Sequence, residues 1–372
     1  MRLSAWNHLI CAAALACAAT ALAAEPLECP LSPTPDDVEA EHELRAQGAY
    51  DLPADRGVGI LYVQLAWHVV RRADGTGALS EERITQAIAD ANWAFEPAGI
   101  QFCRAGETDF IDSDFYFNQI TTLAAINQLR RVNVVPNTIN IYAVEAVSYE
   151  GGPIGGISSF TSSTVQGIVM RNSHIGVADN RSTVPHEIGH YFNLYHTHET
   201  SFGNECAHGG NCATAGDLLC DTPADPVLGP NSVSNSCIYF AGEPDGCGGI
   251  FNPDTRNHMS YSVRTCRDHF SPQQHAKARA TLVNIRHSYI VEVCPEICLG
   301  DATFDGVVDL VDISAVLIAW GADFRPATGT GDANGDGRVN FDDISAILAG
   351  WGTPCGPSGP RGDAPCCAAT IQ

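Results

Sequence analysis

Three histidines and one glutamate lie within one short run of the 372-residue chain, His186-Glu187-Ile188-Gly189-His190-Tyr191-Phe192-Asn193-Leu194-Tyr195-His196. His186 and His190 are four residues apart, so on a helix they share one face and can bind one metal ion. His196 reaches the same ion only if the helix stops and the chain turns back. Asn193 stands where that break is needed, and Asn tolerates the left-handed backbone conformation.

This set of residues predicts a catalytic zinc site with one Zn²⁺. Three neutral imidazoles leave the fourth zinc position open for water, which distinguishes catalytic from structural sites. Zinc lowers the pKa of that water to about 7. Glu187 is the natural base to take the proton and pass it to a leaving amine. The alternative is a helix with incidental histidines, and we expect such spacings by chance in roughly one chain in a thousand.

The pattern resembles the metzincin metallopeptidases, whose motif carries Gly where this chain has Asn193. The resemblance implies a methionine turn beneath the metal, and Asn257-His258-Met259-Ser260-Tyr261 fits it. Met259 would form the floor, and Tyr261 would stabilise the oxyanion. Residues 57–290 further resemble the pappalysin family, which includes ulilysin, in the segments Leu194-Tyr195-His196-Thr197, Gly216-Asp217-Leu218-Leu219-Cys220-Asp221-Thr222-Pro223 and Phe270-Ser271-Pro272-Gln273-Gln274.

The resemblance implies a secreted zinc endopeptidase with further sites in the same domain. Family members bind structural calcium, which carries over to Asp217, Asp221 and Thr222; ordinary turn capping is the alternative. Gly156, Ile157 and Ser158 correspond to the cleft-edge strand, to which an extended peptide substrate could add as a strand; a glycine-rich turn is the alternative.

A cysteine near the N-terminus has two interpretations. In some metzincins a propeptide cysteine blocks the zinc, and Cys29 could do this. The alternative is a disulfide with Cys103, which has no other nearby partner in the first half of the chain.

Residues 300–321 and 331–352 are an internal repeat with 13 of 22 positions identical. Each unit reads as an oxygen-rich loop followed by a short helix, which suits the hard cation Ca²⁺. Position 12 of each loop is Asp, where an EF-hand has Glu. The predicted calcium ligands are Asp301, Thr303, Asp305, Asp309 and Asp312 in the first loop, and Asp332, Asn334, Asp336, Asn340 and Asp343 in the second.

This repeat resembles a dockerin, which implies two bound Ca²⁺ ions and a protein partner of the cohesin type. The recognition positions are Leu310-Val311 and Phe341-Asp342, unlike the small hydroxyl pairs of many cellulosomal dockerins. A cellulosome role is therefore not expected. The alternative is a pair of solvated Asp-rich loops.

Composition places the chain outside the reducing cytosol. With 20 Lys+Arg and 43 Asp+Glu, the formal net charge of −23 argues against nucleic-acid binding. The apolar run 9–22 and Ala21-Leu22-Ala23 predict a signal peptide, and the run is shorter than the ~20 apolar residues of a membrane span. The 15 cysteines favour an oxidising, extracellular location, or the cell surface through docking. The disulfide candidates are Cys206, Cys212, Cys220, Cys237, Cys247 and Cys266.

The expected elements are strands at 60–70, 100–103, 138–144 and 167–170 and helices at 80–95 and 120–131. They predict an α/β (α+β) layer, and the resemblances imply that it is a metzincin-type peptidase domain followed by a small all-α dockerin-like domain. The expected organisation is 1–24 signal peptide, 25–56 propeptide or exposed N-terminal arm, 57–292 peptidase domain, 293–355 dockerin-like domain and 356–372 Pro/Gly/Cys tail.

Two other functions are compatible with these features. One is a calcium-dependent adhesion or scaffold protein with an inactive peptidase fold. The other is a zinc enzyme of a different hydrolytic class. The joint presence of the three histidines, Glu187, Met259 and Tyr261 favours an active peptidase.

Overall fold

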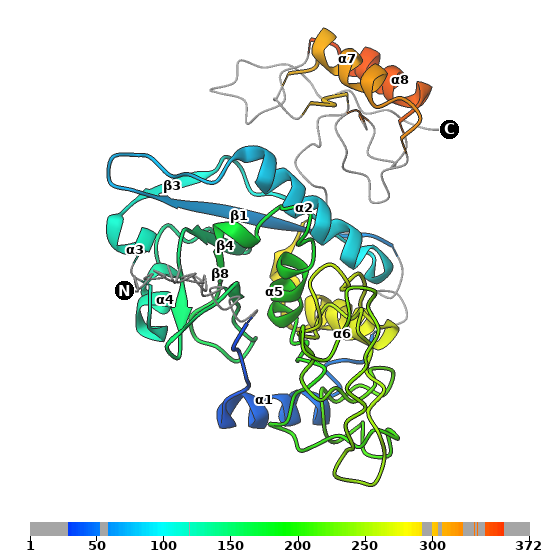
Figure 1. Cartoon of the computed structure of the whole chain (residues 1–372). Helices are drawn as coiled ribbons and strands as arrows, with labels where there is room; N and C mark the ends of the chain where they lie inside the picture. The colour runs from blue at the N-terminus through cyan, green and yellow to red at the C-terminus, as the bar shows by residue number, and fades with distance from the viewer. Residues whose placement is uncertain are drawn as a thin grey trace, which may run out of the picture.

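The computed structural model describes residues 29–52, 59–118, 120–291, 300–303, 307–322, 331, 333 and 339–352. Its centre is a mixed sheet in the order β2-β1-β4-β8-β7 (Figure 1), with bounds β2 Ile100–Arg104, β1 Leu61–Arg71, β4 Ile139–Val144, β8 Ile168–Arg171 and β7 Gly156–Ile157. The first four strands are parallel, whereas β7 is antiparallel to β8 and forms one edge. Two shorter strands also pair with β1, namely β3 (Asp109–Asp112) and β9 (Ile290–Val291).

Both faces of this sheet are covered by helices, so its central strand β4 is buried along its whole length. On β4, Ile139 and Ile141 enter one core, while Tyr142 and Val144 enter the other. This alternation follows from the two-residue period of a strand. The first core is completed by α2 (Glu81–Phe95) and α5 (Thr183–Tyr191), and the second by α3 (Asp114–Asn118) and α4 (Leu123–Leu129). The sheet therefore holds α5 against its first face.

The four predicted strands and the first predicted helix are confirmed to within one or two residues. The helix predicted at 120–131 is shorter, because Thr122 caps α4 by accepting a hydrogen bond from the Ala125 backbone N–H at 3.2 Å. The sequence patterns did not indicate β3, α1 (Pro35–Ala46) or α6 (Pro272–Ala280). The remaining short elements are β5 (Ser148–Tyr149), β6 (Gly152–Pro153) and single turns at Glu96–Ala98, Asn172–His174, Thr281–Ile285 and His287–Tyr289.

The N-terminal arm, residues 29–52, packs against the peptidase domain. Its helix α1 begins with a capping box between Thr34 and Asp37. The side chain of Arg45 donates to the Leu218 carbonyl at 3.1 Å, and Asn284 donates to the Ala49 carbonyl at 2.8 Å. The arm is thus docked along its described length and not exposed, which is compatible with the other interpretation of this segment, a propeptide.

The chain after α5 is poor in regular structure until α6 and is held by disulfides. The six predicted cysteines pair as Cys206–Cys247, Cys212–Cys220 and Cys237–Cys266. A disulfide of this kind typically stabilises the folded state by about 2–4 kcal/mol, because it lowers the conformational entropy of the unfolded chain. The helix α6 then begins at a capping box between Ser271 and Gln274.

The C-terminal repeat forms two helices, α7 (Leu310–Ile318) and α8 (Phe341–Gly350), that share a small core of their own. Asp309 caps α7 and Asn340 caps α8, each in a capping box with the aspartate three residues later. Gly300 of the first unit has φ 106° and lies against α8, and Gly331 of the second unit has φ 108° and lies against α7. The two glycines thus occupy equivalent places, as the sequence repeat implies. In the part of the chain that is described, every helix is too short or too polar to traverse a lipid bilayer.

Candidate metal centre and active site

Helix α5 carries His186, Glu187 and His190 and ends where the sequence requires it to. Asn193 adopts φ +59°, the left-handed conformation expected at this position. Its side chain holds the turn, because its Oδ1 accepts a hydrogen bond from the Thr161 backbone N–H at 3.0 Å. The chain then reverses and brings His196 back to the helix, so the predicted break is confirmed.

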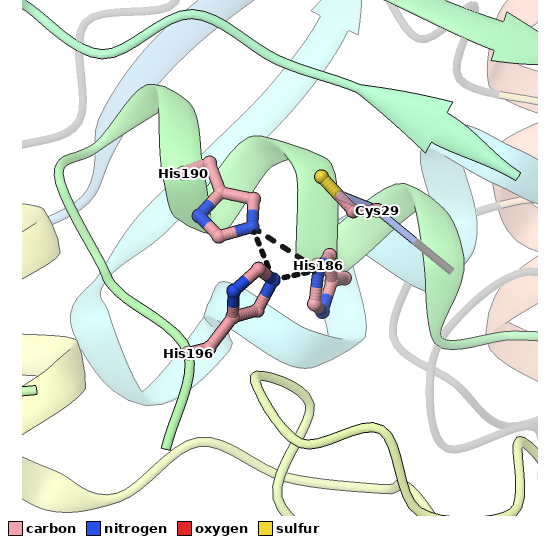
Figure 2. A group of neighbouring side chains, drawn as sticks. All are labelled: Cys29, His186, His190 and His196. Atoms are coloured by element: carbon pink, nitrogen blue, oxygen red, sulfur yellow. Dashed lines mark hydrogen bonds between the residues drawn. The ribbon is translucent and has the colours of Figure 1, made fainter. Parts of the chain in front are cut away.

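The three imidazoles converge on one point (Figure 2). The Nε2 atoms of His186, His190 and His196 are 3.0–3.2 Å apart, and all three side chains are buried. His186 donates from Nδ1 to the His258 carbonyl at 2.7 Å, and His190 donates from Nδ1 to the Leu194 carbonyl at 2.8 Å. These bonds fix the tautomers, so the Nε2 lone pairs face inward.

Such a donor set fits Zn²⁺, which bonds to histidine nitrogen at about 2.0–2.1 Å. Burial, reinforced by the neighbouring imidazoles, holds the pKa values of His190 and His196 well below the usual value. His190 and His196 are therefore neutral, as metal ligands must be.

The thiol of Cys29 lies beside the three histidines (Figure 2). Its Sγ and one nitrogen from each of the three all lie within 4.8 Å of one another. The alternative disulfide between Cys29 and Cys103 is wrong, because Cys103 is disulfide-bonded whereas Cys29 carries a thiol. The reason is the path of the arm: it leads Cys29 to the histidines, while Cys103 lies on β2, at the other edge of the sheet from β7.

Glu187 is fully buried and lies against the edge strand β7. A Cβ atom built on Gly156 would be 2.7 Å from Oε1 of Glu187, so only glycine fits there. Gly156 and Ile157 pair with Met170 and Val169 of β8, which leaves the other edge of β7 outside the sheet. Ser158 follows directly and is also buried.

A residue that the sequence did not indicate holds this strand in place. Arg130, at the end of α4, is buried and donates from Nη2 to the Ile157 carbonyl at 2.7 Å. Burial lowers the pKa of the Arg130 guanidinium to about 10. No sequence motif distinguishes this arginine from a surface one.

The predicted methionine turn lies directly beneath α5. Met259 is fully buried, and its Sδ would be 2.7 Å from a Cβ atom added to Gly189. The ring of Tyr261 is 4.8 Å from the ring of His196. Asp225, which the sequence did not single out, accepts from Thr197 Oγ1 at 2.7 Å and from Ser260 Oγ at 2.8 Å. It therefore ties the chain after His196 to the methionine turn.

The predicted peptidase-domain calcium residues separate into two places. Thr222 donates from Oγ1 to Asp217 at 2.8 Å, and both are buried. Asp221 instead accepts from Ser271 Oγ and from the Gln273 backbone N–H, both at 2.7 Å, beside the N-terminus of α6.

Glu205, which the sequence did not single out, is the carboxylate that interacts with Asp217. Burial and the charge of Asp217 raise the pKa of Glu205 to about 8, and burial raises that of Asp217 to about 7. Glu205 Oε2 and Asp217 Oδ2 are both buried with no hydrogen-bond partner among the described residues. Glu205 stands twelve residues before Asp217 and next to Cys206, a spacing that carries no common motif.

In the C-terminal repeat, Asp312 and Asp343 are fully buried and Asp301 is nearly so. Asp312 accepts from the Thr303 backbone N–H at 2.9 Å, and Asp343 accepts from the Ala333 backbone N–H at 2.8 Å. Asp309 and Asn340 accept from backbone N–H groups of the helices that they cap. The other predicted ligands, Asp305, Asp332, Asn334 and Asp336, lie outside the described residues.

Comparisons with known proteins find metalloprotease relatives of this chain. The family model described as pregnancy-associated plasma protein-A matches residues 156–283. An extracellular metalloprotease of Colletotrichum graminicola is 29% identical over 290 residues, covering 74% of this chain and 96% of the relative. An extracellular metalloprotease of Pyricularia oryzae is 29% identical over 232 residues, covering 59% of this chain and 74% of the relative. A mutant of Tannerella forsythia promirolysin has the same fold, with a TM-score of 0.52 and 17% identity over 70% of this chain and 96% of that one.

Proposed function

Because the chain belongs to the pappalysin family of metzincin metallopeptidases, we propose that it is a secreted zinc endopeptidase in which Glu187 is the general base. Zinc held by His186, His190 and His196 would acidify the attacking water and polarise the peptide carbonyl. Glu187 takes the proton of that water and delivers it to the leaving amine. The phenol of Tyr261 donates a hydrogen bond to the developing oxyanion.

The observation that carries this proposal is the convergence of three neutral Nε2 atoms next to a buried glutamate. The test is hydrolysis of an unfolded protein by the activated enzyme, with and without a zinc chelator. We expect chelation to abolish cleavage and added zinc to restore it. Persistent cleavage without metal would contradict the proposal.

The substrate is an extended peptide that adds to the outer edge of β7. The strand β7, with Gly156 and Ile157, is the last in the sheet, so its outer edge has no partner among the described strands, and Ser158 follows it directly. Arg130 fixes the strand from behind. Strand addition uses backbone hydrogen bonds, so affinity depends on the main chain and specificity on side-chain pockets.

The chain in the described conformation is the latent form. The Cys29 thiol occupies the position beside the histidines that a water needs for catalysis. Activation therefore requires the arm to leave. The sequence places Arg56 between the arm and β1, so limited digestion with trypsin is a practical way to obtain the activated enzyme.

A structural calcium ion is held by Glu205, Asp217 and Thr222 in this proposal. Glu205 and Asp217 interact electrostatically, and one buried oxygen of each has no hydrogen-bond donor among the described residues, so the two carboxylates repel and a divalent cation would remove the repulsion. Asp221 acts as a cap of α6 and is left out of this set.

The C-terminal repeat is a dockerin-like module that binds two calcium ions and tethers the enzyme to a protein partner. Its buried Asp312 and Asp343 are the final ligands of the two loops. The outer faces of α7 and α8 are apolar and exposed, as a docking surface would be: Leu310, Val311, Leu317, Ile318, Phe341, Leu348 and Trp351 are all more than 45% exposed. Native mass spectrometry of the whole chain should count three calcium ions, two of them in this module, and Asp312→Ala and Asp343→Ala should each lower the count by one.

The alternative function is calcium-dependent adhesion through the same module, with an inactive peptidase domain. The exposed apolar faces of α7 and α8 are compatible with it. The two functions differ in the behaviour of the activated wild-type protein towards unfolded substrates. Partner binding with no cleavage under any activation condition would favour adhesion.

A further inference from the structure

The segment that follows the third proposed zinc ligand brings one more ring to the metal centre, that of His198. The backbone N–H of Glu199 donates to the His196 carbonyl at 3.0 Å, which closes a turn with His198 inside it. The neighbouring Thr197 is tied to the methionine turn, because its backbone N–H donates to the Met259 carbonyl at 3.3 Å. The backbone of His198 is therefore fixed on both sides.

The ring of His198 contacts two side chains of the site at once. It is stacked on the His196 imidazole, with 4.7 Å between the ring centroids and 8° between the planes. It also contacts the phenol ring of Tyr261, with centroids 4.3 Å apart and planes inclined by 59°. Since the rings of His196 and Tyr261 are themselves 4.8 Å apart, the three rings form one cluster in mutual contact.

His196 differs from the other two proposed zinc ligands in how its ring is held. His186 and His190 are oriented by hydrogen bonds from Nδ1 to the backbone carbonyls of His258 and Leu194. Within the described part of the chain, Nδ1 of His196 makes no such bond, and ring contacts take its place. Partners that orient a metal ligand typically change metal affinity or activity by about 10–100-fold when they are mutated.

The contacts of His198 at this centre are made by its ring. Its Nδ1 is buried and has no hydrogen-bond partner among the described residues. Stacked and tilted ring pairs at these separations are the arrangements that aromatic side chains prefer. A phenyl ring can make the same contacts, so phenylalanine is the replacement that conserves them.

We propose that His198 is a positioning residue of the active site, whose ring holds the His196 imidazole and the Tyr261 phenol at a fixed separation. The inference rests on the proposed peptidase function, in which His196 binds the metal and Tyr261 donates to the oxyanion. An oxyanion donor is most effective when its place is fixed before the charge develops. Without the ring of His198, both side chains lose a contact that limits their rotation.

Zinc retention tests the contact with His196 and does not depend on turnover. Activated wild type, His198→Ala and His198→Phe are incubated with increasing concentrations of a zinc chelator, and the zinc that stays bound is measured. We expect the zinc affinity of His198→Ala to fall roughly ten-fold or more and that of His198→Phe to stay close to wild type. His287→Ala, at an exposed histidine, should match the wild type. Unchanged affinity in His198→Ala, or equal losses in the Ala and Phe variants, would overturn the inference.

Cleavage rates at saturating zinc test the contact with Tyr261. We expect His198→Ala to lower kcat roughly ten-fold or more with little change in KM, and His198→Phe to restore most of the rate. In a Tyr261→Phe background, which already lacks the hydroxyl group, His198→Ala should lower kcat no further. Independent, multiplicative losses in the double variant would overturn the positioning role.

The two measurements separate this inference from the function on which it rests. Absence of all cleavage by the zinc-loaded, activated wild type would count against the peptidase function. The zinc affinities of the His198 variants would still decide whether this ring holds His196.

Discussion

Glu41 of the N-terminal arm and Lys277 of α6 form a buried ion pair, with Nζ 2.8 Å from Oε1. Tyr50 and Tyr195 donate hydrogen bonds to the same carboxylate from their hydroxyl groups. Tyr195 directly precedes His196, so the arm is anchored next to the segment that carries this histidine, in addition to placing Cys29 beside the three histidines. Both contacts would hold the proposed latent form.

Removing one member of this pair should loosen the arm strongly. Glu41→Ala leaves Lys277 buried without its carboxylate, which typically costs 3–5 kcal/mol. We expect a lower unfolding midpoint and faster release of the arm by trypsin. Glu43→Ala, on the exposed face of the same helix, should change stability by less than about 0.5 kcal/mol. Equal behaviour of the two variants would show that the pair does not hold the arm.

The same carboxylate predicts a dependence of the latent form on pH. Burial alone would raise the pKa of Glu41, but Lys277, Tyr50 and Arg45 bring it below its usual 4.5. Its folded-state pKa is lowered, so its stabilising contribution is present above the unfolded pKa and is lost as pH falls through the lower folded-state pKa. Wild-type unfolding midpoints should therefore fall more steeply than those of Glu41→Gln between pH 5 and pH 3. Parallel curves would contradict this linkage.

Replacing Cys29 tests the latency directly. Cys29→Ser removes the thiolate that competes with water at the metal, and hydroxyl groups are much weaker zinc ligands. We expect the undigested variant to show activity that the undigested wild type lacks. In the cobalt-substituted latent protein, a thiolate-to-cobalt absorption band should be present in wild type and absent in Cys29→Ser. Its absence from both proteins would exclude Cys29 as a ligand.

Gly156 should tolerate no side chain. An alanine Cβ would lie 2.7 Å from Oε1 of Glu187 and 2.8 Å from its Cδ, so either the base or the strand must move. A displacement of this size can cost roughly 100-fold in rate. Gly152→Ala is the matched control, because nothing lies within 4 Å of its added Cβ. Similar values of kcat/KM for the two activated variants would show that the Gly156–Glu187 contact is unimportant.

Calcium binding in the peptidase domain should depend on Glu205 and not on Asp221. Glu205→Gln removes a carboxylate next to Asp217, so thermal stabilisation by added calcium should shrink. Asp221→Asn alters only the cap of α6 and should preserve that stabilisation while lowering the midpoint slightly. The reverse pattern would restore the assignment made from the sequence.

Local patterns predicted most of the sheet and the zinc-binding residues. The three histidines are close in sequence, and the strands β1 and β4 consist mostly of apolar residues. A short stretch of sequence is therefore enough to predict both features. The arm was missed as a packed element because α1 is polar on nearly all sides and is held by one buried carboxylate, Glu41. Hydrophobic periodicity cannot detect such a helix.

Contacts between distant segments account for the other differences. Cys29 and His186, Glu205 and Asp217, and Arg130 and Ile157 meet only through the fold. None of these pairs has a spacing that a motif could encode. The choice between Cys103 and the histidines as the neighbour of Cys29 likewise depended on the path of the arm, which single-sequence reasoning left open.

The role of Glu187 is tested most directly by the peptide-cleavage rate of activated Glu187→Ala protein, measured at the same zinc content as the activated wild type. His186 and His190 are oriented by bonds from Nδ1 to backbone carbonyls, which the substitution leaves in place, so the variant should retain one zinc ion. We predict that kcat falls by about 10²–10⁴-fold, as for loss of a general base. A fully zinc-loaded variant that cleaves at the wild-type rate would contradict the proposed mechanism.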